Sequence, residues 1–128
     1  MLAPALTEFM FRFCPSVQRL EALLYMHAHP DRLWTAHELA GGVQPIGLED
    51  ARDLLATFYG HGFLVAVSFD AFRYEPTSPE LAREVAALAK AYAEQRIAIV
   101  EHLATLSGLD SLRSFADAFV IRKGRKHG

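Results

Sequence analysis

Residues 35–64 read TAHELAGGVQPIGLEDARDLLATFYGHGFL and contain two short helical patterns separated by a turn. Thr35 precedes the first pattern as an N-cap residue, and Glu38 follows as the second half of a capping box. Gly41 and Gly42 end this helix, and residues 43–47 form the turn. The second helix has apolar residues at three- and four-residue steps: Leu48, Ala51, Leu54, Leu55 and Phe58. Gly60 and Gly62 close it.

A further helix precedes this pair. Residues 16–28 repeat apolar side chains at helical spacing, and Ser16 is placed to cap them. His29-Pro30 stops this helix because the residue before a proline is pushed out of the α region. Leu33-Trp34 is long enough for only a very short strand. Residues 1–15 form an apolar N-terminal arm.

After the helix pair the sequence pattern changes from that of a helix to that of extended strands. Residues 63–67 are rich in strand formers, a turn falls near Asp70, and residues 72–74 return before Pro76. This pattern predicts a β-hairpin. Ser78 then caps a long helix over residues 79–106, and a shorter helical pattern follows to residue 121. Residues 122–128 form a basic tail. The predicted fold class is mainly α with a small β-hairpin, an α+β chain.

Three short motifs resemble those of bacterial winged helix-turn-helix regulators. Residues 35–40 look like the "T-x-x-E-L-A" opening of their second helix. Leu54-Leu55, Phe58 and the Gly-rich residues 60–64 look like the end of their third helix, before the wing. Residues 74–77 resemble the return strand of the wing. The match covers residues 16–78, and MarR- and PadR-like regulators are the nearest shape. The resemblance implies sequence-specific DNA binding by the third helix and the wing.

Composition limits the other classes. The chain has 128 residues, enough for one domain with its own core, and 52% of them are hydrophobic. One cysteine, Cys14, excludes an internal disulfide and favours a buried apolar role in a reducing, cytoplasmic setting. The first residues lack a basic leader, and no apolar run is long enough for a membrane span. No nucleophile motif, phosphate loop or metal-ligand spacing appears, so we expect no enzyme, no metal and no cofactor.

The charge pattern weighs against simple DNA reading. Residues 16–76 carry four arginines and eight carboxylates, a net charge of −4. The third helix exposes Glu49, Asp50 and Asp53, which would repel phosphates. Groups suited to groove and backbone contacts are Gln44, Arg52, Thr57 and Arg73. Further phosphate contacts are available in the tail, from Arg122, Lys123, Arg125 and Lys126.

The long helix predicts a homodimer. A helix over residues 79–106 would be about 40 Å long, longer than a domain of this size is wide. Its apolar residues recur at alternating four- and three-residue steps, which is the spacing of a coiled-coil seam. The predicted interface residues are Leu81, Val85, Leu88, Tyr92, Ile99 and Leu106. The alternative is that this face covers the chain's own core.

Two functional hypotheses follow. The first is a dimeric winged-helix transcriptional regulator that binds duplex DNA. The second is a winged-helix module that does not bind DNA directly and meets a protein partner at Glu49, Asp50 and Asp53. A ligand pocket between the long helices and the winged domain is a further possibility, and its aromatic lining would come from Trp34, Tyr59, Phe69 and Tyr92.

Overall fold

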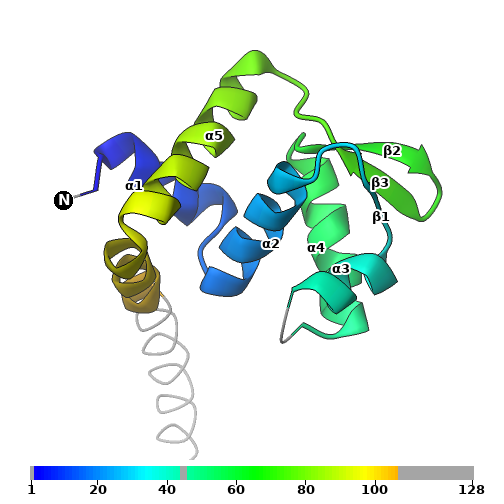
Figure 1. Ribbon diagram of the computed structural model, residues 1–128, viewed down its shortest axis with the longest axis horizontal. Coiled ribbons are helices and arrows are strands. Elements are labelled where there is room, and N and C mark those ends of the chain that lie inside the picture. The colour runs from blue at the N-terminus through cyan, green and yellow to red at the C-terminus, as the bar shows by residue number, and fades with distance from the viewer. Residues whose placement is uncertain (1, 44–45, 107–128) are drawn as a thin grey trace, which may run out of the picture.

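The computed structural model describes residues 2–43 and 46–106. Within them the chain is mainly helical with a small antiparallel sheet, which confirms the α+β prediction. Figure 1 shows α1 and α5 on one side of α2, with α3, α4 and the sheet on the other. In chain order the elements are α1 (Pro4–Phe13), α2 (Val17–Ala28), β1 (Leu33–Trp34), α3 (Ala36–Gly42), α4 (Leu48–Gly60), β2 (Leu64–Ser68), β3 (Ala71–Tyr74) and α5 (Pro79–Glu94). The chain is helical again over residues 96–106.

The predicted N-caps are all formed. The Ser16 hydroxyl accepts a hydrogen bond from the backbone N–H of Arg19 at 3.2 Å. Thr35 accepts one from Glu38 N–H at 3.2 Å, and Ser78 accepts one from Leu81 N–H at 3.1 Å. Each cap satisfies a backbone donor that the first turn of a helix leaves without a partner, so these three hydroxyls set where α2, α3 and α5 begin.

The sheet joins the hairpin to the segment before α3. Its strand order is β1-β3-β2, and both pairings are antiparallel. Trp34 in β1 lies opposite Phe72, while Leu64 in β2 lies opposite Tyr74. A register shift between Ala66 and Ser68 interrupts the β2–β3 pairing near its tip. The hairpin is therefore tied at its base to the core through β1 and is free at its tip.

Aromatic side chains fill the junction between α1, α4 and β2. Phe63 is fully buried, with ring centroids 6.0 Å from Phe9, 5.3 Å from Phe13 and 6.0 Å from Phe58. Tilted and edge-on ring pairs at these distances add attraction to the apolar area that they bury. Trp34 is also fully buried, and its ring packs against that of Tyr25 near the C-terminal end of α2. One continuous core thus runs from α1 to the sheet.

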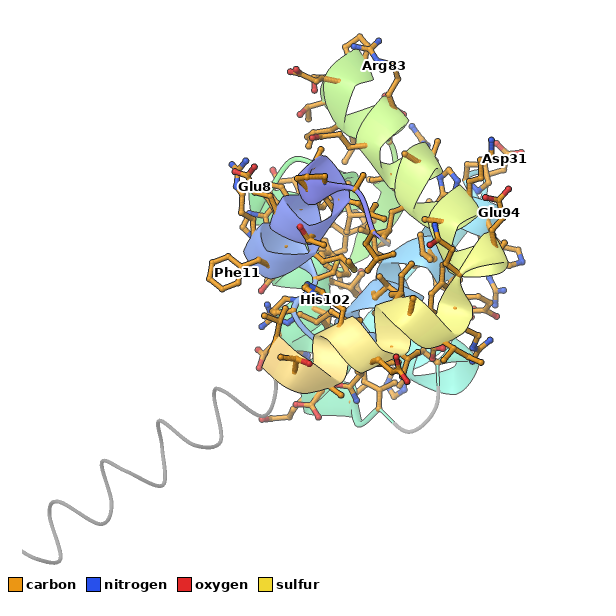
Figure 2. All side chains as sticks on the ribbon, turned by 90° about the vertical axis from the view of Figure 1, so that its left-hand side faces the viewer. Glu8, Phe11, Asp31, Arg83, Glu94 and His102 are labelled. Atoms are coloured by element: carbon orange, nitrogen blue, oxygen red, sulfur yellow. The ribbon has the colours of Figure 1, made fainter. Side chains whose placement is uncertain are left out.

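The predicted N-terminal arm is corrected to a helix. Residues 4–13 form α1, which begins with Pro4 in its first turn and packs on α5. Phe9 and Met10 face the core, while Phe11 is 66% exposed and projects outward in Figure 2. A proline at the first helical position suits a helix start because its missing N–H would have had no partner there.

The single long helix over residues 79–106 is also corrected. Helix α5 ends at Glu94, and Gln95 takes a non-helical conformation with φ −133° and ψ 45°. Figure 2 shows the chain turning sharply after Glu94. The turn brings Ile99 and Leu103 into the core, where both are buried. A straight rod would carry these two side chains past the body, so their burial explains the break.

The predicted seam faces the chain's own core. Val85, Leu88 and Ile99 are fully buried within one chain, so they offer no surface to a second copy. The other predicted interface residues are half-buried: Leu81, Tyr92 and Leu106. The structure thus agrees with the alternative stated above, in which the apolar face of residues 79–106 covers the chain's own core. Homodimerisation itself stays a prediction.

Gly62 controls how the hairpin leaves α4, and its replacement tests this role. Its φ is +90°, and an added Cβ would lie 2.7 Å from Thr77 Oγ1. We expect Gly62→Ala to lower the free energy of unfolding by about 1–3 kcal/mol, because side chains other than glycine are strained at this φ. Gly60→Ala is the matched control, since its Cβ would meet nothing within 4 Å. Urea unfolding should leave the control within about 1 kcal/mol of the parent, and equal losses in both variants would contradict this role.

Candidate interaction surface

The outer side of α4 and the tip of the hairpin form one candidate surface, which we call the helix–hairpin face. From α4 it comprises the exposed residues Glu49, Asp50, Arg52, Asp53, Ala56 and Tyr59. From the hairpin it comprises Val67, Ser68, Phe69 and Asp70. The opposite side of α4 is buried through Ala51, Leu54, Leu55 and Phe58. This burial fixes the rotation of α4, so the exposed side chains have a defined direction.

A groove of about 430 Å³ lies within this face. The start of α3, the middle of α4 and the hairpin line it together. Its lining residues are Thr35, Ala36, His37, Arg52, Leu55, Ala56, Phe69, Asp70 and Phe72. Apolar groups make up most of the wall, and Arg52, Asp70 and His37 supply polar groups. A groove of this composition suits an apolar side chain that is flanked by charge.

Large apolar side chains stand exposed beside the groove. Phe69 at the hairpin tip is 97% exposed, and Val67 is 46% exposed. Tyr59 at the end of α4 is 50% exposed, and its ring centroid lies 5.6 Å from that of Phe72. A fully exposed phenylalanine buries nothing in the isolated chain, whereas such residues contribute strongly when a partner covers them.

Carboxylates dominate the charge of the outward α4 face. Glu49 and Asp50 lie in the first turn of α4, where the helix dipole favours negative charge. Asp50 and Asp53 also line a shallow hollow of about 130 Å³ with Arg19 of α2. Arg52 is therefore the only cation that α4 itself contributes.

Neighbouring arginines are paired with carboxylates. Arg73 on β3 donates to Glu75 at 3.1 Å, and Arg32 before β1 donates to Glu38 of α3. Arg96 contacts Glu21 at 3.4 Å, far from this face in sequence. Such exposed pairs add little stability, because water and salt screen them. Their effect here is to cancel positive charge that a phosphate backbone would need.

Three of the residues predicted to contact DNA lie in the described part of the chain, on α4 and β3. Arg52 is exposed and lines the groove, as the prediction requires, but Thr57 is half-buried. These two lie five residues apart, about 140° around the helix axis, so they point to different edges of the outer side of α4. Arg73 lies on β3 and is paired with Glu75. Gln44 and the tail residues Arg122, Lys123, Arg125 and Lys126 lie outside the described residues.

The predicted aromatic ligand pocket is not formed by its four residues. Trp34 is fully buried in the core, whereas Phe69 is 97% exposed at the hairpin tip. The Tyr92 hydroxyl donates to the Glu21 carboxylate at 2.6 Å, which joins α5 to α2. Burial and this carboxylate raise the pKa of Tyr92 to about 12. Trp34, Phe69 and Tyr92 thus belong to three different environments.

The one cysteine thiol lies in the core of the described structure. Cys14 is fully buried, as predicted, and burial raises the pKa of its thiol to about 12. The reactive thiolate is therefore scarce at neutral pH. Among residues 2–43 and 46–106, no three His, Cys, Asp or Glu side chains gather closely enough to hold a metal ion. The helices in these same ranges include none with the length and apolar character of a membrane span.

Comparison of the chain with protein-family models, curated proteins and solved structures finds no match. The chemistry of the face therefore has to be read from this molecule alone. The sequence indicated the acidic side of α4 and offered Phe69 for a different pocket, but it did not place Phe69 and Asp70 in a groove beside α4. The available signal was their position at the predicted hairpin turn, where a side chain has no strand neighbour to cover it.

Proposed function

We propose that the chain is a winged-helix module that binds a protein partner through the helix–hairpin face and catalyses no reaction. The element order supports the winged-helix part of this proposal: α2, β1, α3 and α4 precede a two-stranded hairpin, and β1 pairs with its return strand. The choice of a protein partner rests on one observation. Glu49, Asp50 and Asp53 occupy the side of α4 that the fold leaves uncovered.

The same face indicates the chemistry of the partner. Three carboxylates attract a segment rich in arginine or lysine, and complementary charge raises the rate of encounter and rejects wrong partners. The groove between α4 and the hairpin accepts an apolar side chain from that segment. Phe69 then closes over it from the hairpin tip. We therefore propose a basic segment with an aromatic or aliphatic anchor as the bound element.

A second candidate function is duplex DNA binding, and two observations favour it. Arg52 is exposed beside the hairpin and makes no ion pair with any described residue. The chain also holds four cations within residues 122–126. If all four meet phosphates, the logarithm of affinity falls with the logarithm of salt concentration with a slope of about −3.6 per protomer. DNA binding requires α4 to approach phosphates despite its carboxylates.

Charge reversal separates the two candidates. We expect the variant Glu49→Lys, Asp50→Lys, Asp53→Lys to bind a labelled peptide of arginines and phenylalanines at least tenfold more weakly than the parent, because the attracting carboxylates are gone. A protein that reads DNA with α4 should instead bind random duplex DNA more tightly after the same change. Fluorescence anisotropy with both probes, at about 50 mM salt, measures both affinities.

The matched control reverses three exposed carboxylates elsewhere, in the variant Glu8→Lys, Glu84→Lys, Glu94→Lys. It changes the net charge equally but leaves the face intact, so peptide affinity should stay close to that of the parent. Circular dichroism checks folding, since reversing Glu49 and Asp50 removes favourable helix-terminus interactions of about 0.3–1 kcal/mol each. Equal weakening in both variants would reduce peptide binding to a general charge effect and overturn the proposal.

Homodimerisation is tested by sedimentation of the full chain at micromolar concentration. The predicted dimer sediments at about twice the monomer mass of 14.2 kDa. Since the seam residues Val85, Leu88 and Ile99 are buried within one chain, a dimer must use other surfaces. A clean monomer at all concentrations contradicts the prediction and also weakens the DNA candidate, because paired half-sites need paired readers.

A further inference from the structure

We infer that residues 115–126 of the chain dock on the chain's own helix–hairpin face. These residues read FADAFVIRKGRK and lie outside the described part of the structure. The proposal concerns the uncovered face of α4 and the groove beside it, and it names the segment that covers them. The proposal rests on the proposed function only because it concerns the same surface. It also assigns a role to the basic tail.

Charge complementarity is the first argument. The described residues carry eight Arg and Lys against thirteen Asp and Glu, a net charge of −5. Residues 115–126 carry four cations and one carboxylate, Asp117, a net charge of +3. The opposite charges are thus separated along the chain. Glu49 and Asp53 are the part of this negative charge that lies one helical turn from the groove residues Arg52 and Ala56. Asp50 and Asp53 also line the separate hollow beside Arg19.

The order of side chains in the segment matches the face. Phe115 and Phe119 precede the cations at a four-residue spacing. The groove offers Leu55, Phe72 and Phe69 as apolar walls, and Arg52 and Asp70 are its charged lining groups. Glu49 and Asp53 lie one helical turn before the groove residues Arg52 and Ala56, so these carboxylates border the groove. One aromatic side chain in the groove would place the following cations within reach of those carboxylates.

The chain is long enough for this contact. Leu106 ends the described structure, and sixteen peptide units separate it from Arg122. An extended chain of this length spans roughly 53–58 Å. A compact body of about 100 residues has a radius of gyration of about 13 Å. An extended segment can therefore reach α4 from any point on the body, whereas the helix predicted up to residue 121 rises only about 1.5 Å per residue. Docking thus requires this segment to be extended in part.

Docking of the segment makes binding at the face competitive. A basic partner segment must displace the tail. Its apparent dissociation constant therefore equals the intrinsic constant divided by the fraction of chains in which the face is uncovered. Salt weakens the docked state because the charges that hold it are exposed to solvent.

Carbodiimide cross-linking of the full chain tests this contact directly. The reagent joins a lysine amine to a carboxylate in direct contact, and the sequence has only three lysines: Lys90, Lys123 and Lys126. At about 20 mM salt, mass spectrometry should find Lys123 or Lys126 joined to Glu49, Asp50 or Asp53. At about 500 mM salt these links should fall several-fold. Lys90, exposed on α5, is the internal control and should show no links to α4.

Isotope mixing identifies the occupant. When chains of natural abundance are mixed with ¹⁵N-labelled chains, docking within one chain gives links of uniform composition only. Mixed links would assign the contact to a second copy and overturn the proposal. Tail links spread evenly over Glu8, Glu84 and Glu94, or no tail links at all, would overturn it equally.

A second readout uses variants that do not alter the tail. Trypsin should remove the residues after Arg122 several-fold faster in the variant Glu49→Gln, Asp50→Asn, Asp53→Asn than in the parent. The control Glu8→Gln, Glu84→Gln, Glu94→Gln should match the parent, and equal rates in all three proteins would contradict docking. Neither assay contains a partner. A negative result therefore contradicts tail docking alone, and peptide binding by the helix–hairpin face is decided by the anisotropy test.

Discussion

The burial of Phe63 is the constraint on which the placement of the hairpin depends. Phe63 follows Gly62, whose positive φ turns the chain out of α4, and its ring is enclosed by Phe9, Phe13 and Phe58. The cluster joins α1, α4 and the start of β2 in one contact region. One end of the hairpin is fixed there and the other is paired with β1, so the groove walls on α4 and β3 stand on rigid elements. Phe69 and Asp70 complete the groove from the free tip of the hairpin. A functional surface built on such elements is better defined than one built on loops alone.

Fold and surface chemistry point in different directions in this molecule. The proposed winged-helix arrangement would favour DNA reading, while the exposed charged residues of α4 are three carboxylates and one arginine. Fold does not decide function, and the groups at the site do. The pairing of Arg73 with Glu75 and of Arg32 with Glu38 reinforces the acidic character, because these arginines are already neutralised by neighbours. The protein-binding proposal takes the surface groups as the deciding observation.

Local signals predicted much of the fold. Ser16, Thr35 and Ser78 marked helix starts correctly because a cap acts through its own backbone neighbours. The break at Gln95 has no Gly or Pro to announce it, since it arises from the burial of Ile99 and Leu103 in a core made by distant residues. The same tertiary packing turned the predicted dimer seam inward. Helix α1 was missed because its only start signal is Pro4.

The candidate site was predictable to a lesser degree. The acidic face of α4 followed from helical periodicity, which places Glu49 and Asp53 opposite the buried Ala51 and Phe58. The pairing of Arg73 with Glu75 was accessible in principle, because residues two apart on an extended chain share a side. The groove was not accessible, since it requires the position of the hairpin relative to α4, which the Phe63 cluster sets in three dimensions.

The most direct test of the central claim is amide chemical-shift mapping of the ¹⁵N-labelled full chain with the arginine–phenylalanine peptide and, separately, with random duplex DNA. The account predicts that the peptide changes the chemical shifts of α4 amides from Glu49 to Tyr59 and of hairpin amides from Phe69 to Phe72. It also predicts that DNA leaves these chemical shifts unchanged. Shifts of these amides by DNA, with none by the peptide, would contradict the account.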